Sequence, residues 1–418
     1  MKLFVKVQQN PIILYFSASI ISFLLIFSRR PDAILNPQFW AEDGKVWYAD
    51  AYHHGLIYSL TSPVAGYYQT ISRLVAVFAQ IFPFAYAPLI FNLAAILIKI
   101  VVVNFILSSR LSVSVPSFSL RVLLAFLYLA LPHSHETNAN LTNAQWHLAL
   151  LSFLIIVAAP SEKILWKIFD GTMLLISALS GPFCLLLLPI AAVKFFVKRE
   201  KWTFLLLTIL TVGSLLQISS IMTTERPSSQ PLGATVELFL KIVGGRWFVA
   251  TIVGEKIYYR MINWSLWNAG IAFFVSLAGF AALLYAFAKS NLELRLFIIF
   301  SSMICGGALI SPAVSSEVPQ WTLMWLSGYG SRYWLIPSFC FLTALIYLAV
   351  KADLAPVRYV SIGILVLSVG GIAADWKYPR FKNLEFQRYA AEFENAPVGQ
   401  EVAIPLNPDP WDMRLIKK

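Results

Sequence analysis

Two adjacent carboxylates, Glu42 and Asp43, stand in a segment rich in aromatic side chains, NPQFWAEDGKVWYADAYHHG at positions 36–55. A carboxylate beside aromatic rings at a boundary between water and lipid is suited to accept the proton of a sugar hydroxyl. General-base catalysis of this kind contributes about 10²–10⁴ to a rate. We therefore predict that Glu42 or Asp43 is a catalytic base. In the alternative interpretation, the Trp and Tyr residues form an interfacial belt and the acids mark a solvated loop.

The same segment carries a potential stripe of functional side chains. If the chain is helical from Trp40 onward, Asp43, Trp47, Asp50 and His54 follow one another at intervals of three or four residues. Residues at these intervals share one face of a helix. We therefore predict that Trp40, Asp50 and His54 bind substrate beside the two acids.

A second polar cluster occupies the connection HSHETNANLTNAQW at 133–146, which contains no Lys or Arg. A short turn between apolar segments needs only a few polar residues, so this density favours a surface for sugar hydroxyls or phosphate over a plain hydrophilic cap. We predict that His133 and His135 bind the phosphate group of a sugar donor. The candidate substrate-binding residues of this cluster are Glu136, Asn143, Gln145 and Trp146.

A metal site is not expected in this cluster. Zinc binding by His133, His135 and His147 is disfavoured, because no Cys joins them and their spacing fits no common structural zinc pattern.

The third candidate is Arg332, the only cation in the segment 315–337, where Tyr333 follows it. An arginine at the start of an apolar segment either extends to the lipid headgroups or holds an anionic ligand. Its planar guanidinium suits a phosphate, and the preceding Gly-Tyr-Gly allows close approach of the backbone. Because the first two clusters are expected on the same side of the membrane, we assign Arg332 to the donor phosphate and Tyr333 to substrate.

The composition places these clusters on a membrane protein. Of 418 residues, 58% are hydrophobic and 13% are charged, which is more apolar surface than a single soluble core can bury. The formal net charge of +11 resides mainly in short hinges between apolar blocks. This is the positive-inside pattern of membrane proteins, so nucleic acid is not an expected partner. The three cysteines lie inside or beside apolar blocks and predict no disulfide framework.

The apolar blocks predict an all-α polytopic membrane protein with about eleven transmembrane helices and the N-terminus inside. The first block follows Lys2 and Lys6 and runs into Arg29 and Arg30 without a cleavage site, so we interpret it as a retained signal anchor. The expected spans are 11–28, 87–108, 122–132, 145–159, 168–180, 182–196, 202–222, 265–288, 296–314, 335–350 and 359–374.

The hinges on the predicted cytoplasmic side are short and basic, whereas the outward pieces are longer. The outward pieces are 29–86, 133–144, 223–264, 315–334 and 375–418. The stretch 71–88 is apolar, but counting it as a span would reverse every later hinge, so we place it as an in-plane helix in the first outward loop. The expected organisation is a transmembrane module at 1–374 and a short non-cytoplasmic tail at 375–418.

The layout and several short motifs together resemble the GT-C class of membrane glycosyltransferases, and among them the bacterial O-antigen glucosyltransferases that modify surface polysaccharide. The motifs are Trp40-Ala41-Glu42-Asp43-Gly44, Thr142-Asn143-Ala144-Gln145-Trp146, Arg332-Tyr333-Trp334 and Ile404-Pro405-Leu406-Asn407-Pro408. The resemblance implies a polyprenyl-phosphate sugar donor and inversion at the anomeric carbon. It also implies an acidic base in the first outward loop, matched by Asp43 or Glu42, and a cation near the donor phosphate, matched by Arg332. The tail is shorter than the soluble domains of many members, which leaves acceptor binding unassigned.

The expected function is transfer of a hexose, glucose by the resemblance, from polyprenyl phosphate to a cell-surface glycan or lipid-linked saccharide such as O-antigen lipopolysaccharide. The expected partners are this donor, the glycan acceptor and the lipid bilayer. No nucleotide-binding motif occurs, and no cofactor is expected. The expected location is the bacterial cytoplasmic membrane, with the site facing the periplasm or exterior.

Two alternatives share many of these features. A transporter of lipid-linked sugar or polysaccharide is expected to place paired charges at mid-membrane depth and to show duplicated halves. A polysaccharide polymerase differs from the predicted transferase mainly in its product.

Overall fold

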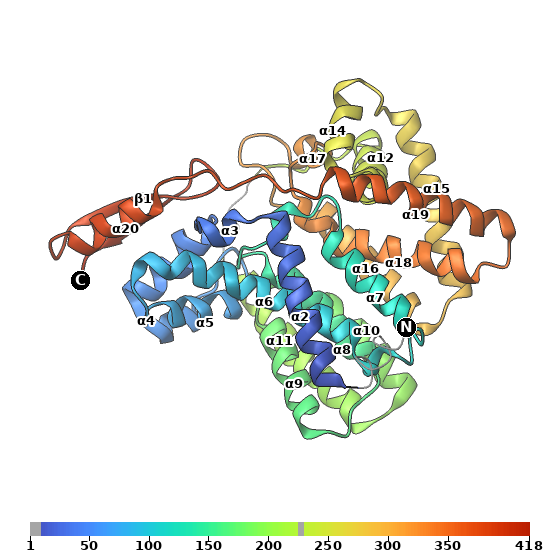
Figure 1. The fold of residues 1–418 in the computed structure, drawn as a ribbon, viewed down its shortest axis with the longest axis horizontal. Helices are drawn as coiled ribbons and strands as arrows, with labels where there is room; N and C mark the ends of the chain where they lie inside the picture. The colour runs from blue at the N-terminus through green and yellow to red at the C-terminus, as the bar shows by residue number, and fades with distance from the viewer. Residues whose placement is uncertain (1–9, 225–229) are drawn as a thin grey trace.

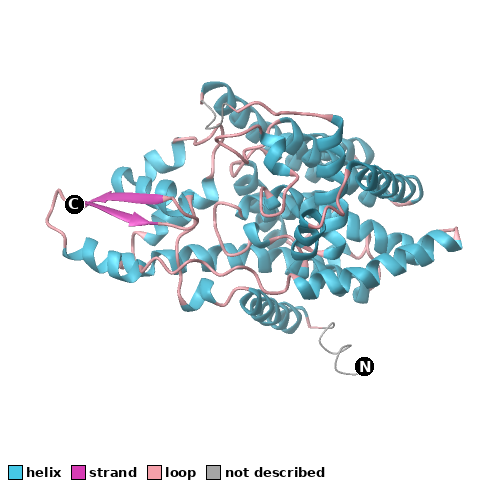
Figure 2. Ribbon diagram, turned by 90° about the horizontal axis from the view of Figure 1, so that it is seen from above, coloured by secondary structure: helices cyan, strands magenta, loops and turns pink. Residues whose placement is uncertain are grey.

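The computed structural model describes residues 10–224 and 230–418. Within these ranges the chain is all-α apart from one two-stranded sheet near the C-terminus (Figure 1, Figure 2). Lys2 and Lys6, which entered the prediction of a signal anchor, lie outside the described residues.

Seven helices of the described chain are long and apolar enough to cross a membrane, judged by length and composition. They are α2 (Pro11–Arg29), α6 (Ala87–Leu107), α11 (Lys201–Thr223), α15 (Ala269–Lys289), α16 (Leu292–Ile310), α18 (Leu335–Lys351) and α19 (Ala355–Ala374). The one-turn helices η2 (Phe84–Tyr86) and η6 (Ser331–Trp334) lead directly into α6 and α18. All seven coincide with predicted spans, so a multi-pass membrane protein is supported.

The other four predicted spans are also helical but shorter, with 13, 14, 15 and 16 residues. They are α7 (Phe118–Ala130), α8 (Ala144–Val157), α9 (Ile164–Ala178) and α10 (Phe183–Lys198). A helix rises about 1.5 Å per residue, so none of them alone covers a hydrocarbon layer of about 30 Å. The number of eleven crossings and their orientation therefore stay predictions.

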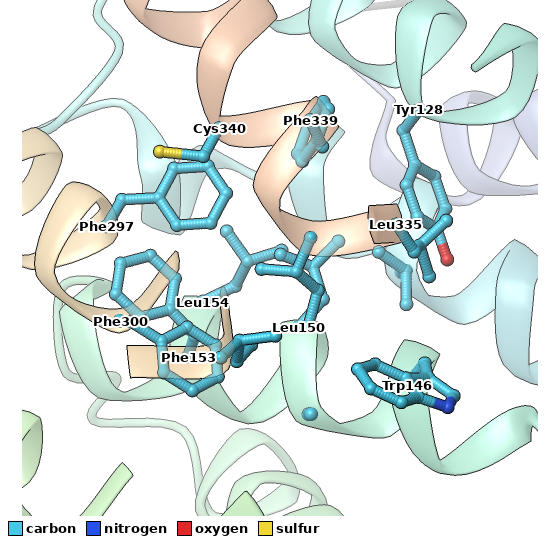
Figure 3. Close-up of a cluster of buried hydrophobic side chains, with 14 of the residues drawn as sticks. Tyr128, Trp146, Leu150, Phe153, Leu154, Phe297, Phe300, Leu335, Phe339 and Cys340 are labelled. Atoms are coloured by element: carbon cyan, nitrogen blue, oxygen red, sulfur yellow. The ribbon is translucent and has the colours of Figure 1, made fainter. Parts of the chain in front are cut away.

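The helix α8 forms the centre of the bundle, because every one of its residues is buried. It is apolar on all sides, as expected for a helix that is surrounded by others. Figure 3 shows Leu150 and Phe153 of α8 facing side chains of α16 and α18. The ring of Phe153 stacks on those of Phe297 and Phe300, with centroids 4.8 and 5.5 Å away. The polar start of α8 is thereby fixed in place by a packed core.

The first outward loop folds into short helices beside the bundle (Figure 1). They are α3 (Asp32–Leu35), the π-helical η1 (Asp43–Tyr48), α4 (Ala49–Thr61) and α5 (Thr70–Ala79). The stretch predicted as an in-plane helix is α5 followed by the turn η2. Its ten-residue helix is too short to span and carries exposed apolar residues such as Phe78, which suits contact with lipid.

The C-terminal tail packs against this first outward loop. It comprises α20 (Phe386–Asn395), β1 (Glu401–Pro405) and β2 (Asp412–Ile416), and the strands pair antiparallel with Glu401 opposite Ile416. The tail and the loop share one hydrophobic core. Its larger members are Phe39, Trp47, Tyr48, Phe84, Phe386, Phe393, Val402, Ile404, Leu406, Met413 and Leu415. The tail is therefore a folded cap, and it contacts the residues around Glu42 and Asp43 through the shared core and the hydrogen bond from the N–H of Ala41 to the carbonyl of Asn407. Figure 1 shows the tail beside the helices of this loop.

The remaining short elements lie in connections between the bundle helices. They are η3 (Ser109–Leu111), η4 (His135–Thr137), α12 (Val236–Ile242), the π-helical η5 (Val243–Val249), α13 (Ala250–Val253), α14 (Glu255–Asn263) and α17 (Gln320–Met324). Connections predicted to be cytoplasmic contact one another, as in the ion pairs Lys194–Glu293 and Lys289–Asp353, each 2.9 Å long. Connections predicted to face outward likewise gather together, and the three polar clusters lie among them.

The buried Arg29 joins three of the outward helix ends. Its guanidinium, at the end of α2, donates to the carbonyl oxygens of Leu129 and Leu131, at the C-terminal end of α7, and of Asp375 and Trp376, just after α19. A guanidinium supplies five N–H donors, so four of these otherwise unpaired carbonyls are satisfied by one side chain. These hydrogen bonds fix the positions of the helix ends next to the polar clusters.

Candidate functional site

Asp43 is fully buried, and hydrogen bonds hold both of its carboxylate oxygens. Oδ2 accepts from the backbone N–H of Leu141 at 2.9 Å, and Oδ1 accepts from the N–H and the hydroxyl of Thr142, each at 2.8 Å. Burial raises the pKa of Asp43 to about 7, against these hydrogen bonds, which lower it. Asp43 therefore connects the first outward loop to the second polar cluster.

Glu42 has the opposite environment although it is the next residue. Its side chain is only partly buried, and no hydrogen bond or ion pair joins its carboxylate to another side chain among the described residues. It lies close enough to Arg332 and Glu136 for their charges to act on it. Burial raises the pKa of Glu42, and Arg332 partly offsets this effect. Of the two predicted acids, Glu42 is the one whose carboxylate has no side-chain partner among the described residues.

Arg332 forms an ion pair with Glu136, so the structure brings together two residues that were predicted in separate clusters. The guanidinium donates to Oε1 of Glu136, and the backbone N–H of Arg332 donates to Oε2 at 2.9 Å. Its second amino group donates to the carbonyl of Ala313 and to the hydroxyl of Tyr333. Burial alone would raise the pKa of Glu136, but Arg332 holds it below its usual value. Nε of Arg332 donates to none of the described residues.

A cavity of about 580 Å³, here called cavity A, opens beside Arg332. Most of its wall is apolar and comes from α10, the end of α11 and the outward half of α16. Its polar end contains four of the predicted site residues and Tyr67. The polar-end residues are Tyr67, Gln145, Trp146, Arg332 and Tyr333.

Two side chains at the start of α8 shape the polar end of cavity A. Trp146 packs edge-on against Phe183 and Tyr333, and its buried indole N–H has no hydrogen-bond partner among the described residues. Gln145 lies against Gly181, whose φ is +103°, and a Cβ at that position would overlap Oε1 of Gln145. An unpaired indole donor in the wall of a cavity is costly unless a ligand or water accepts from it.

His133 and His135 do not reach cavity A, although they were assigned to the same donor phosphate as Arg332. Both face Glu255, whose Oε2 lies 3.4 Å from Nδ1 of His133 and 2.9 Å from Nδ1 of His135. The fully buried Arg246 approaches the other oxygen of Glu255 at 3.5 Å. Burial alone would raise the pKa of Glu255, but the two histidines hold it well below its usual value.

These residues border a second cavity of about 510 Å³, here called cavity B. Most residues that border it are charged, polar or aromatic in type, and they come from the second cluster, α14, the turn at 327–328 and the start of the tail. The lining residues are His133, His135, Glu255, Lys256, Tyr259, Arg260, Ser327, Gly328, Asp375, Lys377, Tyr378 and Pro379. Cavities A and B lie on the two sides of the turn η4, since His135 borders B while its neighbour Glu136 binds Arg332 at A.

Glu42, Asp43 and the remaining predicted site residues lie outside both linings. Asp50 pairs with the buried Arg73 at 2.6 Å, and the exposed His54 lies against Tyr58. Trp40 packs on Phe381 of the tail, with ring centroids 5.8 Å apart.

Two buried residues of the second cluster have structural roles. Asn143 caps the turn before α8 by donating to the carbonyl of Glu136 at 3.0 Å. The ring nitrogens of His147 are both occupied, by the hydroxyl of Tyr128 at 2.7 Å and the carbonyl of Thr137 at 2.8 Å. His147 is thus separated from His133 and His135.

Sequence reasoning missed Tyr67, Arg246 and Glu255. The π-helical turn η5 places Arg246 among apolar residues, and an arginine inside an apolar run is itself a signal for a buried partner. Glu255 opens α14 directly after Gly254, with φ of +82°, a position typical of a carboxylate near a helix start. No comparable signal marks Tyr67.

No protein-family model matches this chain, and no curated protein matches it in sequence. The functional assignment therefore depends on the residues and their geometry. That geometry combines a carboxylate without a side-chain partner at Glu42, a cation at Arg332, a cavity with apolar walls and a polar end, and a second cavity bordered by charged residues.

Proposed function

We propose that this protein is a membrane-embedded glycosyltransferase that moves a hexose from a polyprenyl-phosphate donor to a glycan or lipid-linked saccharide on the non-cytoplasmic face. Cavity A is the observation that carries the proposal. A donor made of an isoprenoid chain, one phosphate and a sugar needs an apolar channel that ends in hydrogen-bond donors, and cavity A has this composition.

The polar end of cavity A supplies donors for the phosphate. Arg332 is held by Glu136 yet keeps Nε uncommitted, and the indole N–H of Trp146 is unpaired. Since Glu136 balances the charge of Arg332, the phosphate is bound by oriented N–H groups more than by net charge. Hydrogen bonds to an ionised group are about twice as strong as neutral ones, so these donors favour the departing phosphate.

Glu42 is the base of the proposed reaction. Its carboxylate accepts the proton of the acceptor hydroxyl as that oxygen bonds to the anomeric carbon. The bond from this carbon to the donor phosphate oxygen breaks in the same step, and polyprenyl phosphate leaves with the electron pair as an anion. Attack from the face opposite the leaving group inverts the anomeric centre. In this assignment Asp43 is a positioning residue, because its hydrogen bonds to Leu141 and Thr142 fix the loop that carries Glu42.

The resemblance noted above adds detail to the proposal. It favours glucose as the sugar, O-antigen or another surface polysaccharide as the acceptor, and the bacterial cytoplasmic membrane as the location, with the site toward the periplasm.

The experiment that tests the proposal is transfer of radiolabelled sugar from a panel of polyprenyl-phosphate sugars by the purified protein. Lipid-linked and soluble oligosaccharide acceptors are supplied, and EDTA is present throughout. A labelled product that the wild type forms and the Glu42→Gln variant does not would establish the transferase. The absence of product with every donor, together with protein-dependent movement of labelled lipid across a vesicle bilayer, would replace the transferase by a transporter.

A further inference from the structure

Cavity B differs from cavity A in the charges that surround it. Three cations border it: Lys256 and Arg260 from α14, and Lys377 from the segment after α19. All three residues are exposed. None of them forms an ion pair with an acid among the described residues. The ammonium groups of Lys256 and Lys377 donate to backbone carbonyls instead, and the side chain of Arg260 has no hydrogen-bond partner there.

The two acids in the lining are already committed to neighbouring groups. Asp375 accepts from the backbone N–H groups of His133, Glu255 and Lys256. Glu255 faces both histidines and Arg246. The acids therefore balance the buried wall of the cavity, and the positive charge of its open side has no counterpart on the protein.

His133 supplies an independent sign of a ligand. Its side chain lines cavity B and is 2% exposed. Nδ1 faces Glu255 at 3.4 Å, whereas Nε2 has no hydrogen-bond partner among the described residues. Buried polar groups in proteins are nearly always paired, with protein, water or ligand. A ligand with acceptor oxygens in cavity B would pair this ring and meet the three cations.

We propose that cavity B is a second binding site, separate from cavity A, for a phosphate-bearing ligand. Phosphate suits the site because its several oxygens can take hydrogen bonds from lysine, arginine and imidazole donors together. Two kinds of molecule carry such a phosphate. One is the headgroup of an anionic phospholipid, and the other is the phosphate of a substrate, which under the proposed function is the acceptor saccharide.

Binding of inorganic diphosphate to the purified full-length protein tests this site without any transfer reaction. The protein is placed in phosphatidylcholine nanodiscs, and the dissociation constant is measured by titration calorimetry. We expect saturable binding of one diphosphate that weakens about tenfold in Arg260→Gln, a variant that breaks no side-chain hydrogen bond or ion pair among the described residues. His133→Phe, which keeps the ring volume, should weaken it as well. Arg388→Gln, an exposed change of equal charge on the tail, should leave it unaltered.

Two results would overturn the proposal. One is wild-type affinity in both Arg260→Gln and His133→Phe. The other is binding that is lost only in Arg332→Gln, because the diphosphate would then occupy cavity A. Both results leave the transferase proposal standing, since that proposal depends on Glu42 and cavity A.

Nanodiscs that contain phosphatidylglycerol distinguish the two sources of phosphate. If the lipid headgroup occupies cavity B, this lipid competes and weakens diphosphate binding to the wild type. If the site serves a substrate, the affinity stays the same, and Arg260→Gln raises the KM for a phosphate-bearing acceptor while the KM for the donor is unchanged.

Discussion

Glu42 and Asp43 are neighbours in sequence but have different environments, and this difference predicts different consequences of substitution. Glu42→Gln should lower kcat by about 10²–10⁴, the usual contribution of a general base, because an amide cannot accept the acceptor's proton. The unfolding midpoint should stay at the wild-type value, since the partly buried Glu42 side chain bonds to no other side chain among the described residues. The measurements are initial rates of labelled-sugar transfer and thermal unfolding in detergent.

The matched control is Asp43→Asn. The asparagine side chain would place its own N–H donor against the N–H group of Leu141 or Thr142. The hydrogen bond lost there should lower the free energy of unfolding by about 1–3 kcal/mol. Glu42→Asp should retain part of the activity, because it keeps a carboxylate. Full activity in Glu42→Gln would contradict the assignment of the base.

Asp43 also predicts a dependence of stability on pH. Burial raises its pKa in the folded protein to about 7, above the value in an unfolded chain, so the folded state binds this proton more tightly. The resulting stability is present at low pH and is lost as the pH rises toward and through about 7. Between about pH 5.5 and about pH 8.5 the loss amounts to about 2 kcal/mol.

This loss should be absent in Asp43→Asn, which cannot titrate, so the difference between the two unfolding curves isolates it. Parallel curves for wild type and variant over this range would mean that the three hydrogen bonds outweigh burial and keep Asp43 ionised.

The sequence was sufficient to identify Glu42 and Asp43 as a pair but not to assign their roles. The donors that hold Asp43 but not Glu42, Leu141 and Thr142, are about a hundred residues away in the chain. No local pattern links such distant segments. The same limit explains why Arg332 and Glu136 were expected to act separately, and why His133 was placed with Arg332.

At the scale of elements, the turn between α9 and α10 sets the position of Gln145 in cavity A. Gly181→Ala should displace this side chain, because the new Cβ would overlap its Oε1 and because φ at +103° is strained for alanine. We expect the KM for the donor to rise about tenfold, equivalent to about 1.4 kcal/mol of binding. The strained backbone should also cost about 1–3 kcal/mol of stability.

Gly171→Ala is the control for this change. Gly171 lies within α9 with open space around its Cα, so alanine there should stabilise the protein by about 0.5–1 kcal/mol and leave the donor KM unaltered. An unchanged donor KM in Gly181→Ala would show that Gln145 does not touch the donor.

The tail supports the loop that carries Glu42. The side-chain amide of Asn407 accepts from the backbone N–H of Lys382 at 2.8 Å and donates to the carbonyl of Lys382 at 3.0 Å. The backbone carbonyl of Asn407 accepts from the N–H of Ala41. Asn407→Ala should lower the free energy of unfolding by about 1–3 kcal/mol and reduce kcat, because the backbone before Glu42 loses a fixed neighbour. Transfer rates and unfolding midpoints provide the test.

Asp409→Asn changes the same turn at an exposed side chain whose one ion-pair partner within the described ranges is the exposed Lys382. Surface pairs of this kind contribute about 0–1 kcal/mol, so both measurements should stay near wild type. A destabilised Asn407→Ala with unchanged kcat would restrict the tail to a structural role.

Some elements were open to prediction and others were not. The tail strands alternate buried and exposed residues, with Val402 and Ile404 facing Met413 and Leu415 on the core side, and this period of two is visible in the sequence. The π-helical turns η1 and η5 carry no such pattern. In η1 the wider turn changes which residues share a face, so Asp43 and Trp47 point to the second cluster while His54 stays exposed.

At the scale of the whole molecule, hydrophobicity located every apolar segment, and all eleven predicted spans are helical. It could not fix their lengths. Of the four shorter helices, α8 is buried along its whole length, whereas α9 and α10 expose much of their apolar surface. A helix that is covered by protein does not have to match the thickness of the bilayer by itself. The basic hinges predicted which connections gather together, since each set must lie on its own side of the membrane.

The orientation predicts which positions react with a membrane-impermeant maleimide in spheroplasts. Val398, in the turn before β1, and Lys163, before α9, are both exposed but belong to opposite predicted sides. We expect Val398→Cys to react in intact spheroplasts and Lys163→Cys only after permeabilisation. The wild type is the control, because all three native cysteines are buried.

The labelling result bears on the chemistry as well as on the topology. Val398 belongs to the tail that packs on the Glu42 loop, so its label reports the side to which Glu42, Arg332 and both cavities open. In the proposed reaction, polyprenyl-phosphate sugars reach cavity A from that side. Labelling of Lys163→Cys in intact spheroplasts, with Val398→Cys protected, would place the cavities on the cytoplasmic face. Donors in the transfer assay would then have to be supplied to that face, and the periplasmic location would be wrong even if the transferase chemistry were right.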